Sequence, residues 1–180
     1  AGDTLTGGAG ADVILGNAGD DTLYGMEAAD TYTGGLGADT FQIAGSAAHT
    51  VSTDITNIIT DFNTTQIDIF DLITNTAFIH GGAAKTGYAE GALGAIADAT
   101  AMQVFTNNIT VADATTGPTE AEMETYFGAT EVYFTAGADG AVYVAADDGI
   151  NTYIMELQNA GADKTFVAAS DEGVVIAVLQ

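Results

Sequence analysis

The sequence predicts a mainly β protein in which a short parallel β-roll, a β-helix of stacked coils, precedes a β-sandwich-like part with one or two short helices. Two observations support this fold class. A nine-residue unit recurs almost five times between Ala1 and Gln42, and β-rich runs separated by Asp-Gly turns follow Glu131. We expect the roll to cover residues 1–45 and a second, β-rich domain to cover residues 46–180.

The repeat keeps an Asp and an apolar residue in register. Its complete copies are GGAGADVIL, GNAGDDTLY, GMEAADTYT and GGLGADTFQ, and AGDTLT is the end of an earlier one. The Asp column is Asp3, Asp12, Asp21, Asp30 and Asp39, and two positions after each stand Leu5, Ile14, Leu23, Tyr32 and Phe41. A flexible Gly/Asp-rich loop is the alternative, but a loop needs no apolar residue at every ninth position.

The two columns also predict how the coils stack. Gly permits the positive φ angles of tight turns, and the triplet around each apolar residue forms a short strand with one inward side chain. Two turns and two strands make a coil of eighteen residues, so repeat n lies over repeat n+2. Asp3, Asp21 and Asp39 then line one edge of the roll, and Asp12 and Asp30 line the other.

Such rows of carboxylates favour a metal. Negative charges at short spacing repel one another, and a hard divalent cation removes this repulsion. Carboxylates and turn carbonyls together supply the roughly 6–8 oxygen ligands that Ca²⁺ prefers.

The pattern resembles the repeats-in-toxin (RTX) nonapeptide family, whose motif G-G-x-G-x-D-x-U-x binds calcium in a β-helix. The resemblance implies that Ca²⁺ is the cofactor. It places ligands in the repeat turns, at Asp3, Asp12, Asp21, Asp30, Asp39, Gly8, Gly10, Asn17, Gly19, Gly35 and Gly37.

The copies are unequal. Met26 and Ala28 stand where the pattern has Gly, whereas Asn17 tolerates the left-handed conformation. We therefore expect the edge with Asp12 and Asp30 to be the weaker calcium row. Because Ala1 opens in the middle of a repeat, we also expect the sequence to be part of a longer chain.

The segment from His49 to Leu72 resembles the stretch that follows the repeats in many RTX proteins. It keeps the Asp61-Phe62 pair, but Thr65 stands where Gly is usual. The resemblance implies that the segment covers the open end of the roll and adds Asp61 and Asp68 as ligands. An ordinary strand pair with polar turns is the alternative.

Local signals organise the C-terminal part. Thr119 and Glu122 form a capping box for a helix that runs to about Phe127. The runs EVYFTA, AVYVAA and NTYIMEL predict a meander with hairpin turns at residues 139–140 and 148–149. The apolar run 174–179 resembles the uncleaved C-terminal signal of type I secretion, and a final core strand is a compatible interpretation.

Composition narrows the partners. The chain has 25 acidic residues, two lysines and no arginine, for a net charge of −23. Nucleic acid and anionic lipid are poor partners because phosphate binding needs cations. No cysteine is present, and no apolar run approaches the roughly 20 residues of a membrane span.

The residues give no sign of catalysis. His49 and His80 are the only histidines, neither lies in H-E-x-x-H, and no G-x-S-x-G motif occurs. We therefore expect no enzyme in this chain. The function favoured is a calcium-binding C-terminal module that couples type I secretion to extracellular folding, in a bacterial cell-surface protein of the surface-layer (S-layer) or adhesin kind.

Two alternatives stay open. The chain could be the tail of a secreted RTX metalloprotease or lipase whose catalytic domain lies upstream. Residues 73–180 could instead form a ligand-binding domain with its own target. Besides calcium and the secretion machinery, the expected partners are a second copy of the chain and a cell-surface polysaccharide.

Overall fold

The computed structural model describes residues 1–45, 56–74, 79–80, 83–84, 88–91, 102–105, 109–114, 117–127, 141–158 and 172–180. The chain divides into two compact units. The first unit is Ala1–Asn75 with Ile176–Gln180, and the second is Thr76–Val175.

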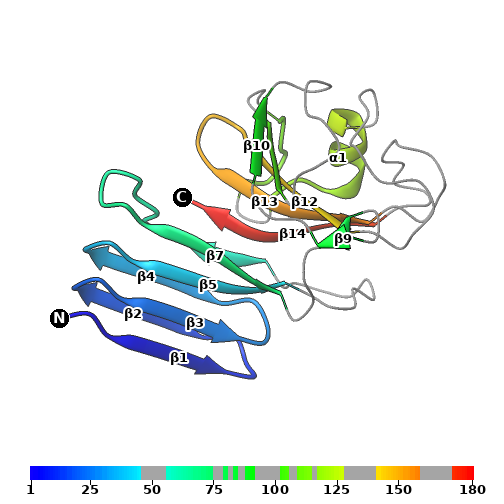
Figure 1. Cartoon of the computed structure of the whole chain (residues 1–180). Coiled ribbons are helices and arrows are strands. Elements are labelled where there is room, and N and C mark those ends of the chain that lie inside the picture. The colour runs from blue at the N-terminus through cyan, green and yellow to red at the C-terminus, as the bar shows by residue number, and fades with distance from the viewer. Residues whose placement is uncertain are drawn as a thin grey trace. The chain divides into compact units, whose positions relative to one another are not determined.

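The repeats form the first unit as a parallel roll (Figure 1). Their strands are β1 (Thr4–Gly8), β2 (Val13–Ala18), β3 (Thr22–Met26), β4 (Thr31–Leu36) and β5 (Thr40–Gly45). Leu5 pairs with Leu23 and Ile14 with Tyr32, an offset of eighteen residues. The predicted coil is confirmed. The strands run beyond the expected triplet because glycines of the following turn join the ladder, as Gly8 does opposite Met26.

Two further strands extend the roll beyond the repeats. They are β6 (Asn57–Ile59), which pairs in parallel with β4, and β7 (Ile69–Thr74), which pairs in parallel with β5. Tyr32 lies opposite Ile59, and Phe41 lies opposite Phe70. The segment after the repeats therefore stacks on the roll as expected, with longer connections than the repeats use.

The C-terminal strand β14 (Glu172–Leu179) ends in the roll. Ala177 pairs in parallel with Asn57, and Leu179 with Ile59. The run 174–179 is therefore a core strand, as one of its two interpretations predicts. Within this unit one sheet has the order β1-β3-β5-β7 and the other continues as β14-β6-β4-β2.

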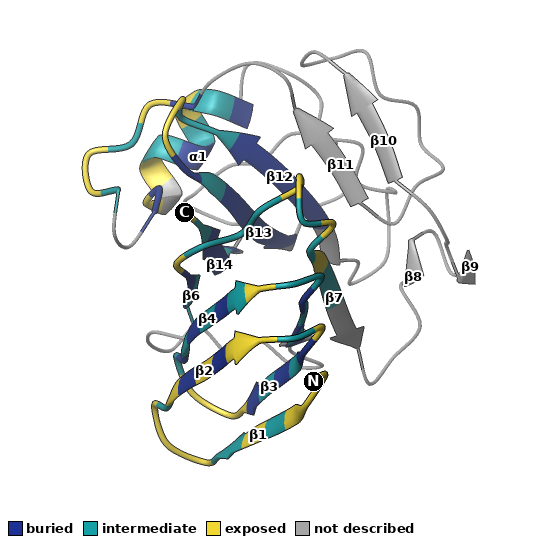
Figure 2. Cartoon of the chain, turned by 90° about the vertical axis from the view of Figure 1, so that its left-hand side faces the viewer, coloured by how far each residue is buried: buried dark blue, intermediate teal, exposed yellow. Residues whose placement is uncertain are grey.

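The core of the roll is a column of inward side chains. Its buried members are Ile14, Leu23, Tyr32, Phe41, Ile43 and Ile59. Buried residues alternate with more exposed ones along the repeat strands (Figure 2). The rings of Tyr32 and Phe41 meet edge to face, with centroids 6.2 Å apart. Each fully buried large side chain contributes about 1.5–3 kcal/mol.

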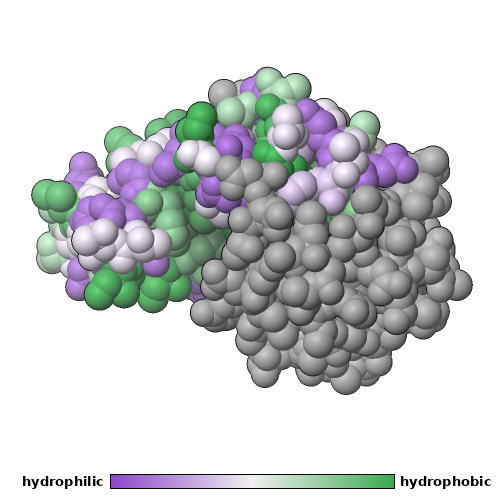
Figure 3. Space-filling model, turned by 90° about the horizontal axis from the view of Figure 1, so that it is seen from above, coloured by the Kyte–Doolittle hydropathy of each residue, from purple (hydrophilic) through white to green (hydrophobic). Residues whose placement is uncertain are grey.

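Apolar side chains also lie on the outside of the roll. Val13, Leu15 and Leu36 are 73%, 51% and 71% exposed. Hydrophobic and hydrophilic residues lie side by side on the coloured surface in Figure 3. Single exposed apolar residues are ordinary on protein surfaces, so the expected self-association stays a prediction.

The second unit contains the strands β8 (Ile79–His80), β9 (Ala83–Ala84), β10 (Tyr88–Gly91), β11 (Met102–Phe105), β12 (Ala141–Asp147) and β13 (Thr152–Gln158). β10, β11 and β12 pair in parallel, and β13 returns antiparallel to β12. The parallel neighbour of β12 was not predicted from the sequence. The turn at 148–149 is confirmed, whereas residues 139–140 and the run EVYFTA lie outside the described residues. The sandwich stays a prediction.

The helix α1 (Glu120–Phe127) begins where the capping box predicts. The Thr119 backbone N–H and hydroxyl both donate to Glu122 Oε2 at 2.8 Å, and Glu122 N–H donates to Thr119 Oγ1 at 3.4 Å. Met123 and Phe127, on one face of the helix, are buried. In the described part of the chain, no helix combines the length and the apolar character needed to cross a membrane.

Candidate metal centre

The Asp residues of alternate repeats form a hydrogen-bonded row along one edge of the roll. Asp21 Oδ1 accepts from the Asp3 backbone N–H at 2.7 Å, and Asp39 Oδ1 accepts from the Asp21 N–H at 2.9 Å. Asp68 Oδ1 continues the row by accepting from the Asp39 N–H at 3.0 Å. We call the row Asp3, Asp21, Asp39 and Asp68 the Asp21 edge.

The opposite edge ends on an amide. Asp30 Oδ1 accepts from the Asp12 N–H at 2.9 Å, and Asn57 Oδ1 accepts from the Asp30 N–H at 3.0 Å. Asn57 Nδ2 then donates to the Ile176 carbonyl of β14 at 3.1 Å. We call the row Asp12, Asp30 and Asn57 the Asp30 edge. Sequence analysis missed Asn57, although it precedes Ile59 by the same two residues that separate each repeat Asp from its apolar partner.

The second carboxylate oxygens distinguish the edges. Asp21 Oδ2 and Asp39 Oδ2 are buried, and no residue in the described part of the chain donates a hydrogen bond to them. The two residues are 1% and 0% exposed. A buried charged acceptor without a partner carries its full desolvation cost. On the other edge, Asp12 Oδ2 accepts from the Gly8 N–H at 2.6 Å.

Backbone oxygens lie beside the carboxylates of the Asp21 edge, as the Gly25 carbonyl oxygen lies beside Asp12 Oδ2 on the other edge. A Cβ placed on Gly16 would lie 2.6 Å from the Gly34 carbonyl oxygen and 2.8 Å from Asp21 Oδ2, so two oxygens border one small space. Gly35 and Gly37 have φ of 102° and 143°, and a Cβ on either would overlap the carbonyl oxygen of Asn17 or Gly19. This stacking requires glycine. The residues present therefore fit a hard cation with oxygen ligands.

Charge on the buried carboxylates is disfavoured without a cation. Burial raises the pKa of Asp39, the carboxylates of Asp68, Asp21 and Asp61 raise it further, and the hydrogen bond from Asp21 N–H only partly opposes them. Burial and the nearby Asp12 raise the pKa of Asp30 in the same way. A bound cation reverses this balance because it stabilises the ionised form.

Asp61 and Asp68 lie beside the turn of residues 34–39. Asp61 accepts from the N–H groups of Gly34 at 2.9 Å and Gly35 at 2.8 Å. Asp68 Oδ2 accepts from the Asn63 N–H at 2.9 Å, and Gln66 Oε1 accepts from Gly37 N–H at 2.8 Å. These side chains satisfy backbone donors of the turn, and their role as metal ligands stays a prediction.

The turn Gly25–Asp30 is strained. Met26 and Ala28 adopt φ of 78° and 70°, the left-handed region that side chains avoid. A non-glycine residue there costs of order 1–3 kcal/mol. The turn of residues 7–12 lies on the same edge. A Cβ placed on its Gly10 would have no heavy atom within 4 Å. The predicted ligand positions Gly8 and Gly10 thus lie in a looser turn than Gly35 and Gly37.

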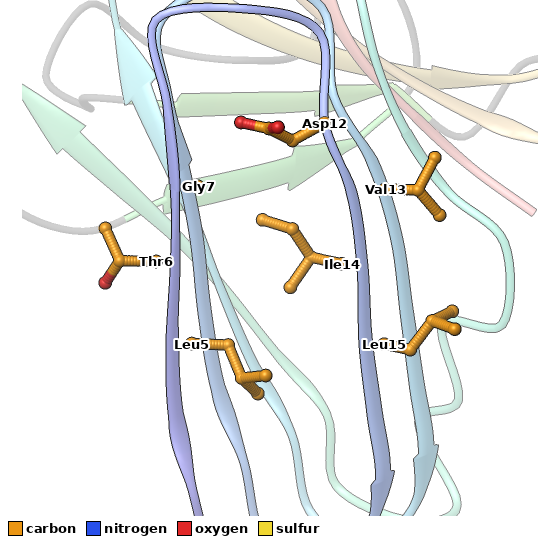
Figure 4. A pocket seen from close by; sticks show the side chains of 7 residues that line it. All are labelled: Leu5, Thr6, Gly7, Asp12, Val13, Ile14 and Leu15. Atoms are coloured by element: carbon orange, nitrogen blue, oxygen red, sulfur yellow. The ribbon is translucent and has the colours of Figure 1, made fainter.

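A pocket of about 280 Å³ opens between β1 and β2 in the first coil. Leu5 and Ile14 point into it and Asp12 lies at its turn, while Thr6, Val13 and Leu15 point away (Figure 4). Its lining carries a single carboxylate. In the described parts of the chain, no three side chains among His, Cys, Asp and Glu gather as a metal-binding group. A cation on either edge must therefore take many of its ligands from turn carbonyls.

The family comparison agrees with this geometry. Residues 6–41 match the family model of the RTX calcium-binding nonapeptide repeat, in four copies. Comparison with curated proteins and with solved structures gave no match. The roll is thus a structural calcium-binding module rather than a catalytic fold. The chain carries RTX repeats, which bind Ca²⁺ and are typical of proteins secreted by type I systems, and this indicates an extracellular location.

Proposed function

We propose that this chain is a folding module that couples type I secretion to extracellular calcium. The observation that carries the proposal is the pair of buried oxygens, Asp21 Oδ2 and Asp39 Oδ2, for which the described residues provide no donor. Calcium is the partner that the folded roll needs at these two atoms, with carbonyl oxygens such as that of Gly34 beside them.

Calcium binding in such a roll supplies folding free energy. The ligands of one site come from turns eighteen residues apart, so the site does not exist in the unfolded chain. At 100 times the dissociation constant, each site adds about 2.7 kcal/mol. In the cell interior, where free calcium is scarce, the repulsion among the carboxylates keeps the chain open for export. Outside the cell, calcium fills the turns and the roll folds.

The C-terminal strand connects export to folding. In the unfolded chain the run 174–179 is available as an export signal. In the folded chain β14 pairs with β6 and Asn57 holds the Ile176 carbonyl. The low content of basic residues favours a surface-layer or adhesin parent, for which a second copy or a cell-surface polysaccharide is the expected partner.

Circular dichroism with and without chelator tests the calcium requirement. We expect the β signal and the melting temperature of residues 1–180 to fall in chelator and to recover when calcium is added back. A melting temperature that is the same in both conditions contradicts the proposal.

A secretion assay tests the export half. A fusion carrying residues 1–180 is expressed in a host with a matching exporter, beside a fusion that lacks the last ten residues. We expect the deletion to abolish export. Its control is Val175→Ile, a change of similar apolar character, which should leave export intact. Full export of the deletion would show that the signal lies elsewhere in the chain.

A further inference from the structure

Tyr32 differs from the other inward residues of the roll because it carries a polar group into the turn of residues 25–30. Its side chain is 1% exposed. The hydroxyl accepts from the Gly25 backbone N–H at 3.0 Å and donates to Asp30 Oδ2 at 3.4 Å. One hydroxyl thus joins the first and last residues of this turn.

The equivalent position on the Asp21 edge is apolar. Leu23 follows Asp21 and Phe41 follows Asp39 by the same two residues that separate Tyr32 from Asp30. Neither side chain has a hydrogen to donate, and within the described residues Asp21 Oδ2 and Asp39 Oδ2 have no donor. Among the three buried Asp residues of the repeats, Asp30 has the hydroxyl and a partnered Oδ2, whereas Asp21 and Asp39 have neither.

The space beside the carboxylate is also filled differently. A Cβ on Gly25 would meet Asp30 Oδ2 and would lie 2.5 Å from Tyr32 Oη. The equivalent space at Gly16 is bordered by Asp21 Oδ2 and the carbonyl oxygen of Gly34. A hydroxyl occupies the one position and two oxygen acceptors border the other. At the Gly25 position the Tyr32 hydroxyl thus lies beside the carboxylate, where the Gly16 position has a backbone carbonyl oxygen.

Charge differs in the same sense. The Asp30 edge ends on the neutral Asn57, whereas the Asp21 edge ends on Asp68. Asp20 and Asp61 add two carboxylates to the turn 34–39, through Ala38 N–H at 2.9 Å and through Gly34 and Gly35.

We propose that the Tyr32 hydroxyl takes the place of a calcium ion in the turn Gly25–Asp30, so that calcium loads the Asp21 edge and not this turn. The inference rests on the proposed calcium-driven folding and deepens it, because it names the residue that sets the number of bound ions. Tyr32 closes its turn with hydrogen bonds, whereas Asp21 and Asp39 on the opposite edge each keep an oxygen for the metal.

The pair Asp39 and Phe41 predicts what removal of this hydroxyl does. Tyr32→Phe recreates in the turn 25–30 the arrangement found at Asp39, a buried carboxylate followed by a phenylalanine. We therefore expect Tyr32→Phe to bind one calcium ion more than the unaltered chain. The matched control is Tyr24→Phe on β3, which removes a hydroxyl from a partly exposed tyrosine and should leave the number of ions unchanged.

Calorimetric titration of residues 1–180 with calcium measures these numbers. Asp30→Asn is the second variant, because Asn57 shows that an amide fits the neighbouring position of this row. We expect Asp30→Asn to bind as many ions as the unaltered chain and Asp21→Asn to bind fewer. Equal or fewer ions in Tyr32→Phe, or a loss in Asp30→Asn that matches Asp21→Asn, overturns the inference.

Amide hydrogen exchange separates this inference from the function beneath it. In saturating calcium, Tyr32→Phe should speed exchange at Gly25 by about tenfold, because the amide loses its acceptor. Exchange at Gly25 that is unchanged in Tyr32→Phe contradicts the role of the hydroxyl. An unaltered chain that binds no calcium would instead overturn the proposed function, and it would do so whatever happens at Gly25.

Discussion

The roll and the turn of the β12–β13 hairpin hold two Asp carboxylates in opposite ways, since Asp39 is buried and Asp148 is partly exposed. In the hairpin, Asp148 Oδ1 accepts from the N–H groups of Ile150 and Asn151 at 2.8 Å each, and Oδ2 accepts from Tyr153 Oη at 2.6 Å. In the roll, Asp39 Oδ1 accepts from Asp21 N–H, while Oδ2 has no donor among the described residues. Both oxygens of the Asp148 carboxylate thus have donors, and only one oxygen of the Asp39 carboxylate has one among the described residues.

The pKa shifts of Asp148 and Asp39 also have opposite directions. Burial alone would raise the pKa of Asp148, but hydrogen bonds from Asn151, Tyr153 and Ile150 outweigh burial and lower it. Burial raises the pKa of Asp39, and too few donors oppose it. Burial and the number of donors therefore set the direction of the pKa shift at each of these two carboxylates.

Removal of calcium should produce the largest difference between the two regions. We expect chelator to abolish hydrogen-exchange protection in β2–β5, since each lost site removes about 2.7 kcal/mol at 100 times its dissociation constant. Protection in β12 and β13 should persist. Equal loss of protection in both regions would show that the hairpin also depends on the metal.

Neutral substitutions should sharpen the comparison residue by residue. Asp39→Asn should remove one site's share of the stabilisation that calcium gives, about 2.7 kcal/mol under the same conditions. Asp148→Asn should weaken the hairpin by about 1–3 kcal/mol, because a charged acceptor is lost, yet leave the gain from calcium unchanged. Melting curves of both variants, with and without calcium, measure these gains. If calcium stabilised both variants equally little, Asp39 and Asp148 would not differ in their dependence on calcium.

Acid should act on the two regions with opposite sign. Asp39 has a raised pKa in the folded state, so the folded roll binds more protons than the unfolded chain and gains stability as pH falls through that pKa. Asp148 has a lowered pKa, so its contribution is present above the unfolded value of about 3.9 and is lost as pH falls below it. In chelator, circular dichroism between pH 7 and 4.5 should show increasing β signal. A decreasing signal there contradicts this account.

The smallest expected effect concerns the strained turn of the Asp30 edge. Met26 has φ of 78°, so Met26→Gly should relieve strain of order 1–3 kcal/mol, offset by the roughly 0.5–1 kcal/mol that glycine loses in conformational entropy. We expect a net gain of up to about 1 kcal/mol in calcium. Thr22→Gly on β3 is the control and should destabilise. Denaturant titration measures both, and a loss in Met26→Gly would show that its side chain contributes more than its backbone costs.

The sequence predicted the structure correctly where the residues that contact one another belong to one short motif. The period of nine gave the pairing of Leu5 with Leu23, and Thr119 with Glu122 gave the start of α1, because the interacting groups lie within one motif. It failed where contacts join distant residues. Asn57 reaches Ile176 across 119 residues, and β6 follows an insertion that breaks the period.

Tyr32 shows a different limit. Its column marked it as an inward apolar residue, and its ring does lie in the core. The hydroxyl at the tip reaches a carboxylate in the turn. A repeat pattern predicts whether a side chain points into the core. It does not predict which group a single polar atom of that side chain contacts. The ligand roles predicted for the Asp, Asn and Gly positions of the repeats all stay predictions for the same reason.

Anomalous diffraction from crystals grown in calcium tests the central claim most directly, because it locates the ion itself. We expect peaks about 2.3–2.6 Å from Oδ2 of Asp21 and of Asp39, which is the distance between Ca²⁺ and oxygen ligands. The carboxylate of Asp148 should have no peak beside it and serves as the internal control. Calcium peaks that lie elsewhere, with both Oδ2 atoms still without a partner, would contradict the account.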